Sequence, residues 1–172
     1  DGEGGDDFLY GDNGDDRLRG SPGNDQITGS NGTDEVDYSA AASGVVVDLQ
    51  GGWAEDGEGT RDRLHGIEDV RGSAYDDRVY GSALANRLTG LGGDDLLVGR
   101  SGHDILVGGA GDDDLQGDQG SDRFPWAAGD GSDRVDGGLG ADVLEIEGAP
   151  AGDDDVQVAE DGQVLEIRVG QE

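Results

Sequence analysis

The aspartates of this chain recur at a spacing that suits metal sites built from oxygen ligands. From Gly90 onward, four consecutive groups of nine residues read GLGGDDLLV, GRSGHDILV, GGAGDDDLQ and GDQGSDRFP. Each group has glycine at its first and fourth places, aspartate at the sixth and an apolar residue at the eighth. Carboxylate and carbonyl oxygens are the ligands that calcium prefers. The period therefore predicts metal binding as well as a repeated structure.

The amino-acid composition excludes several classes of metal site and binding partner. The 172 residues include 36 glycines and no cysteine, and the formal net charge is -30. Without cysteine there is no disulfide or thiolate metal site, and two histidines, His65 and His103, offer little for zinc or copper. Nucleic acid and anionic membranes would be repelled, and no apolar run is long enough for a membrane span. The charge instead indicates that multivalent cations complete the fold.

The nine-residue register divides the chain into four parts. A first block of repeats covers residues 2–37, and a second block covers residues 72–145 with a two-residue slip after Pro125 that carries Trp126 and Ala127. Residues 38–71 lose the period and form an insert. Residues 146–172 change to alternating apolar residues, which predicts one or two short antiparallel strands that cap the open end.

The insert has apolar positions spaced for short β-strands. These positions are Val45, Val47, Leu49, Leu64, Ile67 and Val70. We expect the insert to continue the same stack with longer turns. The alternative is a surface loop, but more than thirty structureless residues are uncommon inside a compact domain.

The repeat predicts a flattened solenoid in an all-β fold. Six turn residues leave about three for a strand, so two repeats make one coil with a strand on each side, and the eighth place points into a thin core. Stacked turns lie about 4.8 Å apart. A metal midway between them would lie about 2.4 Å from each, which matches calcium and is too long for magnesium.

Turns two repeats apart share an edge, so their sixth-place residues should face each other, as Asp7 faces Asp25. These pairs, together with carbonyls aimed by glycine turns, predict about eight calcium ions. The alternative is that aspartate after glycine is only turn chemistry. The candidate metal ligands are Asp7, Asp16, Asp25, Asp34, Asp77, Asn86, Asp95, Asp104, Asp113, Asp122, Asp133 and Asp142, with Gly2, Gly4, Gly11, Gly20, Gly90, Gly93, Gly99, Gly102, Gly108, Gly111, Gly117 and Gly120.

Two repeats depart from the pattern, and the fifth place differs from the sixth. Tyr75 and Leu84 replace the fourth-place glycine and Asn86 replaces the sixth-place aspartate, so we expect the sites beside them to be the weakest or empty. The fifth-place acids are predicted to face solvent; these are Asp6, Asp15, Asp94 and Asp112.

The repeats of both blocks resemble the GGxGxDxUx nonapeptide of the RTX, or haemolysin-type calcium-binding, proteins. The insert is also similar to the connecting segment of many secreted RTX proteins, through VDYSAAASGVVVDL and LHGIEDVRGSAYDD. This resemblance implies a right-handed parallel β-roll with calcium in its turns. It also implies export by a type I secretion system and folding only in the millimolar calcium outside the cell or at its surface.

These features predict a monomeric calcium-binding structural module, disordered without calcium, that is not an enzyme. The chain begins at Asp1 within a repeat, so we expect other domains of a parent protein. Neither HExxH nor GxSxG occurs, and no catalytic residue is predicted. Two alternatives stay open. One is a calcium-dependent adhesion or glycan-binding module that uses Trp53 or Trp126, and the other is a non-catalytic part of a secreted protease, lipase or polysaccharide epimerase.

Overall fold

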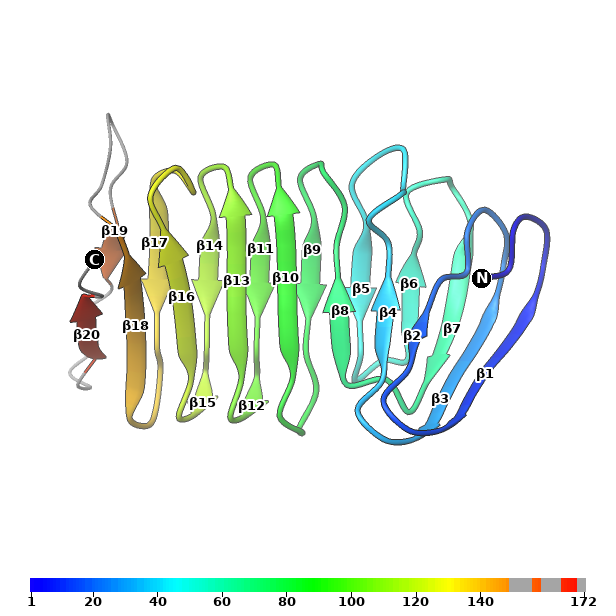
Figure 1. Ribbon diagram of the computed structural model, residues 1–172, viewed down its shortest axis with the longest axis horizontal. Coiled ribbons are helices and arrows are strands. Elements are labelled where there is room, and N and C mark those ends of the chain that lie inside the picture. The colour runs from blue at the N-terminus through cyan, green and yellow to red at the C-terminus, as the bar shows by residue number, and fades with distance from the viewer. Residues whose placement is uncertain (149–155, 159–164, 170–172) are drawn as a thin grey trace.

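The computed structural model describes residues 1–148, 156–158 and 165–169, and these residues form strands joined by turns, without a helix. Figure 1 shows the strands stacked side by side along one long axis. Two sheets face each other, with one strand of a repeat in one sheet and the strand of the next repeat in the other. The prediction of an all-β, parallel β-roll is confirmed, with about eight coils set by the eight-stranded sheet.

Both sheets can be followed strand by strand in Figure 1. The ten-stranded sheet runs in the order β1 (Phe8–Asn13), β3 (Gln26–Asn31), β7 (Arg61–His65), β6 (Trp53–Glu55), β5 (Val46–Asp48), β9 (Arg78–Tyr80), β11 (Leu96–Val98), β14 (Asp114–Gln116), β17 (Asp133–Asp136) and β19 (Val156–Val158). The eight-stranded sheet runs β2 (Arg17–Leu18), β4 (Glu35–Asp37), β8 (Asp69–Arg71), β10 (Arg87–Gly92), β13 (Ile105–Ala110), β16 (Arg123–Ala127), β18 (Asp142–Glu147) and β20 (Leu165–Val169). A two-stranded ladder of β12 (Ser101–Gly102) and β15 (Gln119–Gly120) lies in the turns.

The core is a double row of eighth-place side chains. Parallel pairing aligns residues 18 positions apart, so Leu9 lies opposite Ile27 and Leu88 opposite Leu106. All twelve eighth-place residues are buried, and several are fully enclosed; they are Leu9, Leu18, Ile27, Val36, Val79, Leu88, Leu97, Leu106, Leu115, Phe124, Val135 and Leu144. Each strand is too short to bury much surface alone, so the stacking of coils creates the core.

The insert adds an antiparallel hairpin to one sheet only. Strand β6 pairs antiparallel with both β5 and β7, whereas β4, β8 and β10 are consecutive neighbours in the other sheet. One sheet therefore gains two strands that the other lacks. The stack bends as a result, and Figure 1 shows β1 and β3 inclined to the strands of the second block.

The antiparallel cap predicted at the C-terminal end is wrong. Strand β19 pairs with β17, and β20 pairs with β18, and both pairs are parallel. Alternating apolar residues reveal that a segment is a strand but not its direction, and the open edges of β17 and β18 accept another parallel coil. The rest of that predicted cap, at residues 149–155, 159–164 and 170–172, lies outside the described residues.

The two-residue slip lengthens a strand. Trp126 extends β16, where it is 3% exposed, beside the fully buried Phe124. Register with β18 is kept, since Phe124 lies opposite Leu144 and Trp126 opposite Ile146. The coils at this end therefore bury two side chains of one strand instead of one.

Candidate metal sites

The sixth-place residues form two columns along the two edges of the stack. In each column, the backbone N–H of one sixth-place residue donates to the Oδ1 of the next, over 2.8–3.0 Å. These hydrogen bonds join Asp7 to Asp25, Asp16 to Asp34, Asp77 to Asp95, Asn86 to Asp104, Asp95 to Asp113, Asp104 to Asp122, Asp113 to Asp133 and Asp122 to Asp142. The pairs expected from the period are thus adjacent, including the two across the slip.

The second oxygen of most of these carboxylates has no protein partner. Within the described chain, the Oδ2 atom is buried and accepts no hydrogen bond in eight of them: Asp7, Asp16, Asp25, Asp34, Asp95, Asp104, Asp113 and Asp122. A buried, unpaired carboxylate oxygen costs several kcal/mol of folding free energy, as an order of magnitude. Each of these oxygens is therefore free to bind a cation from outside the chain.

Burial also makes the ionised state of these carboxylates costly. Desolvation raises the pKa of Asp95 to about 8 against the lowering effect of the hydrogen bond from Asp77, and Asp77 and Asp113 raise it further by charge repulsion. Desolvation likewise raises the pKa of Asp104 and of Asp113 to about 7. A bound cation removes this penalty because it replaces the lost water and offsets the repulsion.

First-place glycines leave the space into which these oxygens point. A methyl group on Gly99 would overlap the Oδ2 of Asp104 and lie 3.0 Å from the carbonyl oxygen of Gly117 in the next coil. The same pairing of a carboxylate with a carbonyl of the next coil occurs beside Gly2, Gly11, Gly90 and Gly117. Among the described residues, no three His, Asp or Glu side chains gather around one point. The spaces at the first-place glycines are bordered by carboxylate and carbonyl oxygens, which are the donor types that suit calcium.

Left-handed backbone shapes these turns. Fourth-place glycines have positive φ, such as 143° at Gly111, where an added methyl would overlap the carbonyl of Gly93. Gly4, which the sequence analysis placed among the ligands, is a third-place residue. It is therefore not one of the first-place or fourth-place glycines that shape these turns. Among the residues that the structure describes, seven other than glycine also have positive φ, and all seven occupy the second place: Glu3, Asp12, Ser21, Ser30, Leu91, Arg100 and Asp118. Such a conformation costs about 1–2 kcal/mol per residue, so these turns carry backbone strain.

This strain makes a testable prediction at the second place. Ser30 is exposed with a φ of 85°, so Ser30→Gly is expected to raise the thermal midpoint in calcium by a few degrees. Ser82 occupies the same place without positive φ, and its hydroxyl bonds Leu84 and Asn86, so Ser82→Gly is expected to lower the midpoint. Thermal unfolding followed by circular dichroism compares the two, and equal shifts would contradict the assignment of strain.

In the first two turns of the second block, a serine donates hydrogen bonds to the sixth-place side chain. Asp77 accepts hydrogen bonds at Oδ1 from the Ser73 hydroxyl and from Val45 N–H, and at Oδ2 from Ser73 N–H. Asn86 accepts from Ser82 N–H and donates its amide to the carbonyl of Glu68 over 2.7 Å. Both sixth-place residues are therefore satisfied within the chain, which supports the expectation that these turns bind calcium weakly or not at all.

The fifth-place acids do more than face solvent. Their side chains are exposed, but each accepts a backbone N–H from the following coil: Asp6 from Asn24, Asp15 from Thr33, Asp94 from Asp112 and Asp112 from Ser132. His103 does the same through Nδ1 for Ser121. The fifth place thus forms a second hydrogen-bond ladder, which points the opposite way to that of the sixth place.

Two acids of the insert, which the sequence reasoning missed, continue the columns. Asp25 N–H donates to Asp62 Oδ1 and Asp34 N–H donates to Glu68 Oε2, each over 3.0 Å. A signal was present, because each acid stands two residues before a buried apolar side chain, as every sixth-place aspartate does. This signal was overlooked in the sequence because Asp25 and Asp62 are 37 residues apart, not 18 as in the repeats.

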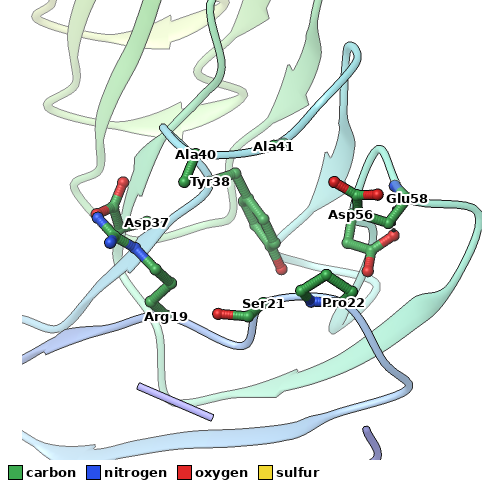
Figure 2. A pocket seen from close by; sticks show the side chains of 9 residues that line it. All are labelled: Arg19, Ser21, Pro22, Asp37, Tyr38, Ala40, Ala41, Asp56 and Glu58. Atoms are coloured by element: carbon green, nitrogen blue, oxygen red, sulfur yellow. Dashed lines mark hydrogen bonds and ion pairs between the residues drawn. The ribbon is translucent and has the colours of Figure 1, made fainter. Parts of the chain in front are cut away.

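A small cavity between the first block and the insert is not a further metal site. It measures about 90 Å³, below the several hundred Å³ of a typical ligand pocket. Figure 2 shows Tyr38 between the Arg19 and Asp37 side chains on one side and Asp56 on the other. Asp37 pairs with Arg17 and Arg19, and Asp56 accepts three hydrogen bonds from Glu58 and Thr60. The Asp37 and Asp56 carboxylates therefore need no cation.

Comparisons with known proteins agree with this geometry. The family model described as the RTX calcium-binding nonapeptide repeat matches the chain in four copies, at residues 1–38, 66–95, 89–124 and 127–144. These matches cover more than half of the 172 residues and leave most of the insert unmatched. A search of curated proteins finds no match. Within the described residues, no helix has the length and hydropathy to cross a membrane.

Proposed function

This chain belongs to the RTX calcium-binding nonapeptide repeat family, and we propose that it is the calcium-binding structural module of a larger secreted protein, disordered without calcium and folded once calcium fills its turns. The observation that carries the proposal is the set of eight buried Oδ2 atoms without a partner in the described chain. Each lies beside a glycine at a turn between two coils. A calcium ion there would be held by the carboxylate and by carbonyl oxygens, and it would link the coils.

The large net negative charge makes folding of the chain depend on calcium. About eight divalent ions would cancel roughly sixteen charges of a net charge of -30, which otherwise keeps the chain expanded by self-repulsion. Because the sites exist only in the stacked form, the free energy of ion binding is also free energy of folding. An expanded chain suits passage through a type I secretion channel, and folding then takes place in the calcium outside the cell.

We assign the chain a non-catalytic role as a monomer, with any activity of the parent protein in its other domains. The tryptophans give no support to glycan binding. Trp126 is 3% exposed, and the Arg61 guanidinium lies 4.1 Å from the centroid of the Trp53 ring. The Trp126 ring is therefore closed to a sugar, and the Arg61 guanidinium covers one face of the Trp53 ring.

Circular dichroism under three conditions tests this function. The chain is measured in chelator, in millimolar calcium and in the same concentration of magnesium. We expect strand signal in calcium alone, because magnesium demands shorter bonds and near-octahedral geometry. Equal strand content in chelator and in calcium would refute the proposal.

A further inference from the structure

Two carboxylates at the end of the first block face the insert instead of another repeat. Strand β3 pairs with β7 so that Ile27 lies opposite Leu64, which places Asp25 opposite Asp62. Strand β4 pairs with β8 so that Val36 lies opposite Val70, which places Asp34 opposite Glu68. The insert thus occupies the position of the next coil on both edges.

Both block carboxylates are enclosed and unpaired on the side of the insert. Asp25 is 1% exposed and Asp34 is fully buried, and the Oδ2 atom of each accepts no hydrogen bond from the described chain. A methyl group on Gly20 would lie 2.5 Å from Asp25 Oδ2 and 3.3 Å from Asp62 Oδ2. These two carboxylates therefore border the same space.

The other edge has the same construction from different residues. A methyl group on Gly29 would overlap both Asp34 Oδ2 and the carbonyl oxygen of Gly66, which belongs to the insert. Glu68 Oε2 accepts the N–H of Asp34 over 3.0 Å, so its carboxylate also lies at this turn. In the repeats, the corresponding space is bordered by a sixth-place carboxylate and a carbonyl of the next coil.

We propose that the insert completes two calcium sites at the end of the first block, with Asp62 at one edge and Glu68 with the Gly66 carbonyl at the other. This inference rests on the proposed function of calcium-dependent folding. It extends the ion columns beyond the repeats, to residues that lack the nonapeptide pattern. The insert then serves the first block as its third coil.

Tyr38 holds the first of these sites in position. Its hydroxyl donates to Asp62 Oδ2 over 2.9 Å, and both side chains are buried. The hydrogen bond fixes the Asp62 carboxylate toward Asp25 and leaves it further lone pairs for an ion. Toward the second block, by contrast, the insert makes only direct hydrogen bonds at these columns, through Val45 N–H and the Glu68 carbonyl. It therefore binds calcium on one side only.

The test counts the ions bound by single variants of the full chain. Native mass spectrometry at saturating calcium compares wild type with Asp62→Asn and Glu68→Gln. Glu55→Gln is the matched control, since it removes the same charge from an exposed acid of the insert. We expect one ion fewer in each of the first two variants and the wild-type number in the control.

Two outcomes separate this inference from the proposed function. Absence of calcium binding by wild type would refute the proposed function itself. Wild-type ion counts in folded Asp62→Asn and Glu68→Gln would overturn the inference alone. If a neutral variant does not fold, Asp62→Glu and Glu68→Asp keep the charge and shift the carboxylate by one methylene. We then expect folding with one severalfold weaker ion, and unchanged affinity for every ion overturns the inference.

Discussion

Replacing Gly111 with alanine is expected to abolish calcium-induced folding of the second block. Its φ of 143° costs alanine about 1–2 kcal/mol. The new methyl group would also overlap the carbonyl of Gly93 in the preceding coil. The ladder from Asp95 to Asp113 fixes the spacing of these coils, so they cannot separate without loss of the ion sites. The total effect is on the order of the whole stability of a small domain.

Gly14 supplies the control for this prediction. It has a φ of 114°, but a methyl group there would meet no described atom within 4 Å. Gly14→Ala is therefore expected to cost only the backbone strain of about 1–2 kcal/mol and to fold in calcium. Circular dichroism in millimolar calcium measures both variants. Equal losses would show that close contact between coils does not decide the need for glycine.

Asp113→Asn is expected to raise the calcium concentration at the folding midpoint severalfold. Its Oδ1 accepts the N–H of Asp95, which an amide oxygen can continue to do. Its buried Oδ2 has no partner in the described chain, and the substitution puts an NH₂ group there, which cannot bind a cation. Asn86 is a natural example, since its amide donates to the Glu68 carbonyl instead.

A substitution at the adjacent Asp112 distinguishes the effect of losing a ligand from the effect of losing a negative charge. Asp112 is exposed and accepts the N–H of Ser132 over 3.0 Å, which asparagine can also accept. Asp112→Asn removes the same charge, yet we expect a midpoint close to that of wild type. Calcium titrations of the two variants provide the comparison. A common shift in both would mean that net charge alone controls folding.

The period predicted the coils, the core and the facing pairs because one constraint sets all three. A strand of about three residues must turn back, so residues 18 apart meet, as Leu88 meets Leu106. The direction of pairing was less predictable. Alternating apolar residues did not reveal that β6 is antiparallel or that β20 is parallel to β18, because direction depends on the connections.

Most of the structural features that the sequence did not predict lie in the turns. Leu91 and Arg100 adopt positive φ although neither residue type favours it, because the turn between stacked coils imposes that conformation. The serine closures at Ser73 and Ser82 depend on a hydroxyl that reaches the sixth-place residue, whereas Ser21 and Ser30, at the same place, adopt left-handed turns. Serine at the second place is therefore compatible with either turn.

The measurement that tests the central claim most directly is a crystal structure grown in millimolar calcium, with the ions located by anomalous scattering. We predict calcium peaks beside the Oδ2 atoms of Asp7, Asp16, Asp25, Asp34, Asp95, Asp104, Asp113 and Asp122. We predict no peak at Asp77 or Asn86, where serines close the turns. A folded roll without ions at the unpaired carboxylates would contradict the account.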